Sequence, residues 1–323
     1  MKILLRTLTL SLLFPFAAFA GKLPGPVVDA AWFKEHVTHV SLIDVRDDLD
    51  TWATAPVFEK DEKTGKEKLT ETGGHIEGAL PLVFKKVRVD RTVDGKKIEK
   101  MLPDRAYVQE LMQATGVAKG RPIVITSPGE SVEQIEAAAR VYWTLKFYGA
   151  DDIALLDGGN AAWIVAGLPV SMTKKDIARG DWEAGTEQRE LLAELVDVEK
   201  ALSDKVQVVD ARPVSQYLGV TFKKPAIAAG GHIAGARNYP TDLRVRPSGI
   251  AQMFLKSEEY RAAMKAQSID SAVPTIAYCN TGHMAAGMWF IQSEILGTKK
   301  VSLYDGSMHE WTTLGKPVVG LGG

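Results

Sequence analysis

The chain has 323 residues, of which 46% are hydrophobic and 24% are charged, a composition that is typical of globular proteins. It carries 39 basic against 40 acidic side chains, and this net charge of −1 gives no electrostatic reason to expect nucleic acid as a partner. Its single cysteine excludes an internal disulfide.

The first twenty residues have the pattern of a cleaved secretory leader. Lys2 and Arg6 give a basic start, an apolar run extends from Leu8 to Phe19, and Ala18-Phe19-Ala20 fits a small-residue cleavage site. The apolar run is short for a bilayer, which takes about 20 apolar residues to cross. We therefore expect an exported, periplasmic protein that begins at Gly21 and has no membrane span after cleavage.

Short β-rich runs alternate with helical patterns along the rest of the chain. Strands are predicted at 40–45, 123–126 and 153–156, and the clearest helix runs from Val132 to a stop at Gly149. One apolar face of this helix consists of Ile135, Ala138, Ala139 and Tyr142. The charged stretch 58–74 is interpreted as a solvated hairpin or loop. The alternation predicts an α/β fold, with a parallel sheet and helices on both faces.

Four sequence signatures occur twice, in the same order. They pair LIDVR (42–46) with VVDAR (208–212), GGHIEGA (73–79) with GGHIAGA (230–236), PIVITS (122–127) with PTIAYC (274–279), and DGGNAAWIVAGLPV (157–170) with DGSMHEWTTLGKPV (305–318). Such a repeat indicates two tandem copies of one domain. We place an N-terminal domain at 21–171, a polar linker at 172–189 and a C-terminal domain at 190–323.

The only cysteine, Cys279, directly follows the predicted strand at 275–278, and a helix is predicted to begin at about His283. In an open parallel sheet, ligands bind outside the carboxyl ends of the strands. The cysteine therefore lies at a position where a ligand would bind.

The residues between strand and helix suit a reactive thiol. Asn280, Thr281 and Gly282 can curl so that several backbone N–H groups point at the sulfur, with Gly282 supplying the backbone freedom. These N–H groups and the helix N-terminus would favour the thiolate, which is the nucleophilic form. A buried, inert cysteine at the end of a strand is the alternative.

The first copy provides an internal comparison for this loop. The position of Cys279 is taken there by Ser127. Pro128 removes an N–H donor, and Glu130 places a negative charge where an anion would bind. The comparison favours one active copy and one silent copy.

Together these signatures resemble the tandem rhodanese-type sulfurtransferases, and the resemblance extends from Val27 to Val319. It implies two rhodanese-like domains, of which the N-terminal one is catalytically silent. It also implies that Cys279 takes a sulfane sulfur from a donor such as thiosulfate, becomes a persulfide, and passes the sulfur to cyanide or a thiol. No metal or organic cofactor is implied. The implied substrate contacts are Asn280, Thr281, Gly282, His283, Met284 and Arg212.

The sequence departs from this family in its positive charges. The loop after Cys279 carries no Lys or Arg, so His283 is its only titratable side chain, and Gln216 stands where active members can carry an arginine. Asp210 and Arg212 recur in the silent copy, which favours a structural ion pair. The basic residues considered for binding an anionic donor are Arg212, Lys223, Lys224, Arg237, Arg244 and Arg246.

Two other functions were weighed. A phosphatase with a cysteine loop would need an arginine at the far end of the loop to hold phosphate, and this sequence has Met284, Ala285 and Ala286 there. A non-enzymatic sulfur carrier or redox-sensing module of the same fold stays open, and turnover with several donors would distinguish it.

Overall fold

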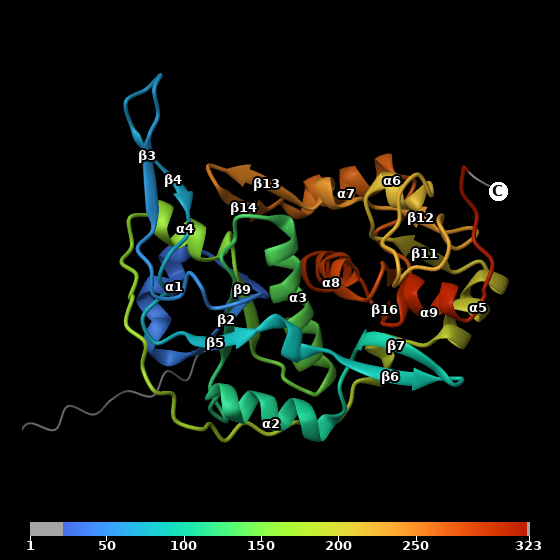
Figure 1. Ribbon diagram of the computed structural model, residues 1–323, viewed down its shortest axis with the longest axis horizontal. Helices are drawn as coiled ribbons and strands as arrows, with labels where there is room; N and C mark the ends of the chain where they lie inside the picture. The colour runs from blue at the N-terminus through green and yellow to red at the C-terminus, as the bar shows by residue number, and fades with distance from the viewer. Residues whose placement is uncertain (1–21, 322–323) are drawn as a thin grey trace, which may run out of the picture.

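The computed structural model describes residues 22–321. The predicted leader at residues 1–20 lies outside this range, so its cleavage and the export of the protein stay predictions. Figure 1 shows the N-terminal half, in blue and green, beside the C-terminal half, in yellow to red. In residues 22–321, no helix is long and apolar enough to cross a membrane.

A parallel five-stranded sheet forms the centre of the N-terminal half. Its strand order is β1 (Val27–Val28), β9 (Ile153–Leu156), β8 (Ile123–Thr126), β2 (Ser41–Arg46) and β5 (Leu80–Val83). Helices α1 (Ala30–His36) and α4 (Gly159–Val165) pack on one face, and α2 (Arg105–Thr115) and α3 (Val132–Phe147) pack on the other. The inner strands are buried along their whole length because helices cover both faces.

The C-terminal half repeats this arrangement. Its parallel sheet has the order β10 (Leu192–Ala193), β16 (Val301–Tyr304), β15 (Thr275–Tyr278), β11 (Gln207–Asp210) and β12 (Arg237–Asn238). One face carries α5 (Leu195–Ser203) and α9 (Ser307–Thr313), and the other carries α7 (Ser257–Ala266) and α8 (His283–Phe290). The predicted fold of two tandem α/β domains is confirmed.

Short helical turns occupy several connections. They are the 3-10 turns η1 (Val37–His39), η2 (Phe84–Val87), η3 (Arg189–Leu191) and η4 (Thr241–Leu243), the one-turn helix α6 (Val214–Tyr217), and a π-helical turn, Ile291–Ile295, that prolongs α8. Gly297 follows that turn with a φ of 70°, so the helical run ends where the sequence predicted.

The predicted helix from Val132 is confirmed as α3, but it is buried on more than the one predicted face. Arg140, Trp143 and Thr144 are buried as well as the predicted apolar residues. The reason is that α3 lies between its own sheet and α8 of the other domain, and the two helices run side by side in the centre of Figure 1. A single core therefore continues from one domain into the other, with Tyr142 packing edge-on against Phe290 at 4.9 Å between ring centres.

The segment predicted as a linker is attached closely to the N-terminal domain. Gly180 N–H donates to Gln113 O at 2.8 Å, and Trp182 N–H donates to Val117 O at 3.1 Å. The Trp182 side chain is only 6% exposed. These backbone bonds and the buried indole hold the polar strap against the domain, although it contains no helix or strand between residues 172 and 188.

Each domain extends a hairpin onto the loops of the other. The hairpin β6 (Val89–Val93) and β7 (Lys96–Met101), cyan in Figure 1, reaches beneath α9, where Leu102 N–H donates to Asp305 Oδ2 at 2.5 Å. The hairpin β13 (Val245–Ser248) and β14 (Ala251–Phe254) returns to the N-terminal domain, where Phe254 N–H donates to Asp157 Oδ1 at 2.8 Å. The two halves thus exchange equivalent contacts.

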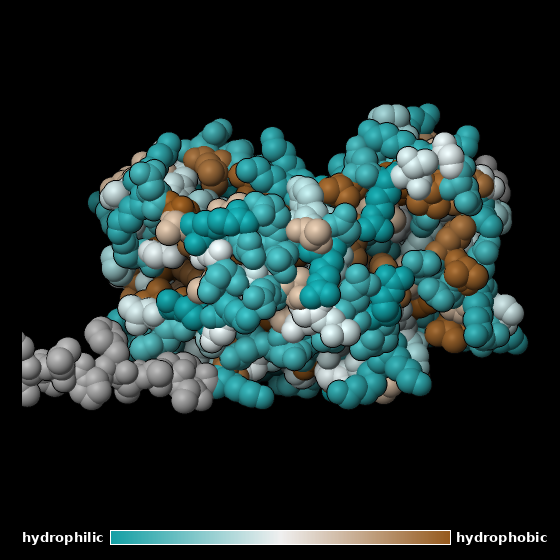
Figure 2. Space-filling view, turned by 90° about the horizontal axis from the view of Figure 1, so that it is seen from below, coloured by the Kyte–Doolittle hydropathy of each residue, from teal (hydrophilic) through white to brown (hydrophobic). Residues whose placement is uncertain are grey.

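The charged stretch 58–74 forms a third hairpin, as predicted. Its strands β3 (Val57–Lys60) and β4 (Glu67–Glu71) pair antiparallel and project away from the body of the protein in Figure 1. The face shown in Figure 2 is mostly hydrophilic, with hydrophobic side chains in small separate groups, and a notch divides its two lobes.

Candidate active site

Cys279 lies at the carboxyl end of β15, where the sequence placed it, and its side chain is fully buried. The chain then turns through Asn280, Thr281 and Gly282 into α8. Gly282 has a φ of 72°, a conformation that other residues rarely adopt. A Cβ at this position would collide with Arg140 and Asp305, so the turn requires glycine for space as well as for its dihedral angle.

Ser307 organises the backbone on both sides of the turn. Its Oγ accepts the N–H of Cys279 at 3.1 Å and the N–H of Gly282 at 3.2 Å, and it donates to Tyr304 O at 2.7 Å. The N–H of Gly282 is therefore directed to Ser307 and not to the sulfur. The N–H groups of four further residues have no acceptor among the hydrogen bonds of residues 22–321; these are Asn280, Thr281, His283 and Met284.

Ser307 itself has a φ of 50°, and the matching residue of the first copy, Gly159, has a φ of 59°. A glycine would relieve this strain, which costs about 1 kcal/mol or more for a non-glycine residue. The second copy nevertheless carries serine, whose hydroxyl accepts both N–H groups. The sequence comparison did not single out this residue, although Ser307 opposite Gly159 is visible in the fourth signature.

We expect Ser307→Ala to lower the free energy of unfolding by about 2–4 kcal/mol, because two buried N–H groups lose their acceptor. Ser307→Gly should be less damaging by about 1 kcal/mol, since it loses the same hydroxyl but relieves the dihedral strain. Urea unfolding of the two variants measures both effects. Equal stability of Ser307→Ala and the wild type would contradict this role.

Two arginine side chains in the core attach the loop to the N-terminal domain. Arg140, on α3, forms a buried ion pair with Asp305 at 2.5 Å and donates to Gly282 O at 3.1 Å. Arg244, from the C-terminal domain, pairs with Glu136 of α3 and donates to Met284 O at 2.9 Å. The N-terminal domain therefore fixes the loop through charge-assisted hydrogen bonds, directly by Arg140 and indirectly by the pairing of Glu136 with Arg244.

The motif residue Arg212 is part of a buried ion pair. Its guanidinium binds Asp210 at 2.6 Å and donates to Gly231 O at 2.7 Å. Arg46 makes the same pair with Asp44 in the first copy, at 2.8 Å. The structural interpretation of this motif therefore fits the geometry. Arg212 Nη1 is buried without a hydrogen-bond partner, so a contribution to the site stays a prediction.

A cavity of about 650 Å³ lies beside the loop. Its lining includes the predicted residues Asn280, Thr281, His283 and Met284, together with Gln216, whose Oε1 accepts a hydrogen bond from Asn280 at 2.7 Å. The Cys279 side chain is fully buried and is not part of this lining. The structure thus brings most of the predicted loop residues together at one cavity.

Basic side chains from both domains line this cavity. Lys223 and Lys224 come from the C-terminal domain and were among the predicted candidates, whereas Arg88 and Lys100 come from the N-terminal domain and were missed. The available signal was the basic stretch FKKVRVDRTVDGKK at 84–97, but no local pattern shows that it crosses to the other domain.

Three other basic candidates are excluded by their positions. Arg244 is neutralised by Glu136. Arg246, on the exposed strand β13, pairs with Glu259 of α7. Arg237 lines a separate cavity at the amino ends of the second sheet's strands. None of the three is in the lining of the Cys279 cavity.

His283 is in the cavity wall but does not provide a positive charge. Its Nε2 lies 3.0 Å from Glu133 O, and a carbonyl oxygen can only accept, so Nε2 carries the proton. Its ring also packs against Phe84, 4.7 Å between centres. Burial between the domains and the nearby Arg88 charge lower the pKa of His283 to about 3, so the ring is neutral at physiological pH.

This lowered pKa predicts a pH dependence of stability. Between pH 6.5 and pH 3 the unfolded chain binds a proton at residue 283 that the folded chain does not, so acid favours unfolding. From pH 7 to pH 5 the free energy of unfolding of the wild type should fall by about 1 kcal/mol more than that of His283→Gln. This figure is smaller than the pKa shift alone would give, because solvent partly screens this half-buried group. Urea unfolding at both pH values measures it, and parallel pH profiles of the two proteins would contradict the assignment.

A family model described as the rhodanese-like domain matches residues 29–166 and again residues 194–314. The chain belongs to the rhodanese-like domain family. Each match covers most of one of the two sheets, so the chain carries this domain twice.

Relatives of this rhodanese-like chain are named as sulfurtransferases. A "putative thiosulfate sulfurtransferase" of Mycolicibacterium smegmatis is 30% identical over 256 residues, which covers 76% of this chain and 86% of the relative. The 3-mercaptopyruvate sulfurtransferase of Mus musculus is 26% identical and covers 71% of this chain and 75% of the relative. These relatives support a rhodanese-type sulfurtransferase.

A solved structure, the 3-mercaptopyruvate sulfurtransferase SseA of Escherichia coli, is similar with a TM-score of 0.67 and 21% identity. The match covers 88% of this chain and 98% of the SseA chain. At this identity the likeness establishes the fold of the tandem rhodanese-like domains.

The first rhodanese-like domain has a smaller cavity at the equivalent place. It measures about 230 Å³, and its lining is rich in acids, namely Asp47, Asp48, Glu71, Glu130 and Glu133. Ser127 is buried there at the position equivalent to Cys279. Glu130 Oε1 accepts a 2.6 Å hydrogen bond from the Thr72 hydroxyl, so the carboxylate is fixed in place. This electrostatic environment is unfavourable for an anionic sulfur donor.

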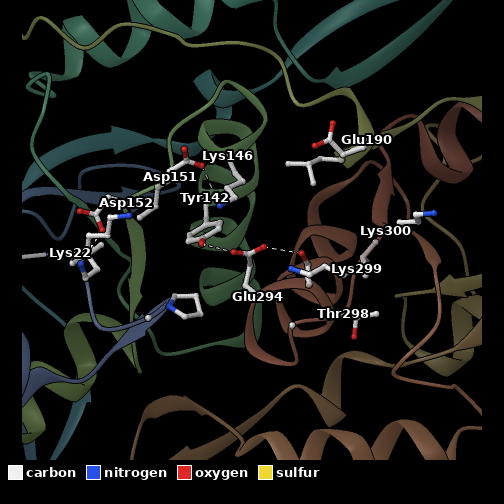
Figure 3. A pocket seen from close by; sticks show the side chains of 18 residues that line it. Lys22, Tyr142, Lys146, Asp151, Asp152, Glu190, Glu294, Thr298, Lys299 and Lys300 are labelled. Atoms are coloured by element: carbon white, nitrogen blue, oxygen red, sulfur yellow. Dashed lines mark hydrogen bonds and ion pairs between the residues drawn. The ribbon is translucent and has the colours of Figure 1, made fainter.

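Another cavity, of about 600 Å³, lies at the amino ends of the strands, between the two rhodanese-like domains (Figure 3). Tyr142 donates to Glu294 across it at 2.8 Å, and Figure 3 shows these two side chains pointing toward one another. Lysines and acids alternate around the rim. Ligands of parallel sheets bind at the carboxyl ends, so this cavity is a poor candidate for the reaction site.

Proposed function

We propose that the protein is a sulfurtransferase that moves a sulfane sulfur from thiosulfate or a similar donor to cyanide or a thiol acceptor. The observation that carries the proposal is the position of the single cysteine. Cys279 lies at the end of a central strand, and its loop has N–H groups without acceptors. Four basic side chains, Arg88, Lys100, Lys223 and Lys224, line the adjoining cavity together with two acids, Glu99 and Glu133.

The proposed reaction has two steps at one sulfur. The Cys279 thiolate attacks the outer sulfur of thiosulfate, the S–S bond breaks, and its electron pair leaves with sulfite, so the cysteine becomes a persulfide anion. Cyanide then attacks the terminal sulfur and leaves as thiocyanate, which restores the thiolate. The N–H groups of Asn280, Thr281, His283 and Met284 are available to stabilise the negative charge in both states.

A sulfur-carrier function is the second candidate. The chain is 25% identical to the "Sulfur carrier protein TtuD" of Thermus thermophilus, with coverage of 91% of this chain and 96% of the relative. A carrier would accept one sulfur and then wait for a protein acceptor, whereas an enzyme would turn over with cyanide or a small thiol.

Mass spectrometry of the purified protein after incubation with thiosulfate or 3-mercaptopyruvate tests the proposal. One added sulfur on the peptide that contains Cys279, lost again upon addition of cyanide, is the expected result. A single loading without repeated turnover would favour the carrier. No sulfur adduct with either donor would contradict both functions.

A further inference from the structure

The N-terminal domain supplies part of the positive charge at the cavity beside Cys279. The loop after the cysteine has no basic side chain, so an anionic donor must find its counter-charge elsewhere on the cavity wall. Arg88 follows η2 directly and lines this cavity, and its guanidinium carbon lies 4.2 Å from the centre of the Phe84 ring. Stacking on the ring fixes the plane of the guanidinium.

Arg88 differs from the other arginines near the loop because it has no protein acceptor. In residues 22–321, no ion pair involves Arg88, and its Nε is buried without a hydrogen-bond partner. Arg140, Arg212 and Arg244 each bind a carboxylate. An enclosed cation without a partner is costly, and an anion bound in the cavity would remove that cost.

The repeat supplies an internal comparison for Arg88. Arg88 follows η2 and Arg244 follows η4, and each precedes the hairpin that crosses to the other domain. Arg244 is neutralised by Glu136 on α3. The two equivalent positions thus hold Arg244, which is paired with a carboxylate, and Arg88, which has no protein partner and lines the cavity beside the loop.

The charge of Arg88 persists at neutral pH. Burial and the neighbouring Arg140 lower the pKa of Arg88 to about 10, whereas Asp305 and a Cys279 thiolate raise it. The guanidinium therefore remains protonated at pH 7.

We propose that Arg88 of the silent N-terminal domain binds the anionic group of the sulfur donor, a sulfonate or a carboxylate, at the Cys279 site. The fork of the guanidinium can donate paired hydrogen bonds to two oxygens of either group. Lys100, Lys223 and Lys224 add positive potential around it. This inference rests on the proposed function, and it gives the first domain a role in the chemistry of the second.

Steady-state kinetics with thiosulfate and cyanide test the assignment. Arg88→Gln should raise KM for thiosulfate about 10- to 100-fold, as expected for the loss of hydrogen bonds to a charged group, with a smaller effect on kcat. Arg88→Lys should recover part of this loss, because it keeps the charge but not the fork. The matched control is Arg91→Gln, an exposed arginine on the same hairpin that does not line the cavity.

A second measurement does not depend on sulfur transfer. Iodoacetate and iodoacetamide alkylate the same thiol and differ in one negative charge, so the ratio of their rates at Cys279 reports the local potential. Arg88→Gln should lower the iodoacetate-to-iodoacetamide ratio about tenfold, and Arg91→Gln should leave it unchanged. The iodoacetamide rate also shows whether the loop is intact in each variant.

The outcomes separate the two proposals. If the wild type forms no persulfide but the alkylation ratio still falls in Arg88→Gln, the proposed function fails and the anion site stands. If Arg88→Gln matches Arg91→Gln in both KM and alkylation ratio, the assignment of Arg88 is overturned, whatever the turnover of the wild type.

Discussion

Replacing Cys279 with serine should reduce kcat for sulfur transfer from thiosulfate to cyanide by at least about 10³-fold, because a hydroxyl cannot form the persulfide. The free energy of unfolding should change by only about 1–2 kcal/mol, since the two side chains are similar in size and one buried hydroxyl is added. Thiocyanate formation measures the first effect, and urea unfolding measures the second. Full sulfur transfer by the serine variant would refute the persulfide mechanism.

The first copy of the domain offers a stringent control for this variant. Adding Ser127→Cys to Cys279→Ser restores a thiol at the equivalent strand end of the N-terminal domain. We expect no recovery of activity, because the smaller cavity there is lined by acids and Glu130 is fixed by Thr72. Recovery would show that the surroundings of the thiol matter less than its place on the scaffold.

Gly282→Ala should lower the free energy of unfolding by about 3–5 kcal/mol and remove most of the sulfurtransferase activity. The added Cβ would occupy the space of the buried Arg140–Asp305 pair, and this pair also holds the loop through Gly282 O. Separating a buried ion pair leaves charges without partners, which is much more costly than the dihedral strain alone.

Gly297→Ala is the matched control for Gly282→Ala. Gly297 has almost the same φ, 70° against 72°, but a Cβ there would meet no atom within 4 Å. It should therefore show only the dihedral penalty, about 1 kcal/mol. Urea unfolding of the two variants separates strain from collision, and equal destabilisation would rule out the predicted clash.

The repeated signatures and the buried strands of the fold were readable because they depend on local patterns. The strand Ile123–Thr126 is buried along its whole length and mostly apolar, and α3 begins and ends near the predicted residues. The same local reading found Cys279 and its glycine turn, since a cysteine between strand and helix is a feature of a short segment.

The amino-acid sequence by itself thus determined two α/β domains, the strand-end position of Cys279 and the loss of that cysteine in the first copy. Only the tertiary structure decided which charges surround the cysteine. Arg244 was a candidate and is neutralised by Glu136, whereas Arg88 was not considered and lines the cavity. The physical reason is that electrostatic contacts form through space between residues distant in the chain, here across a domain interface that no local spacing encodes.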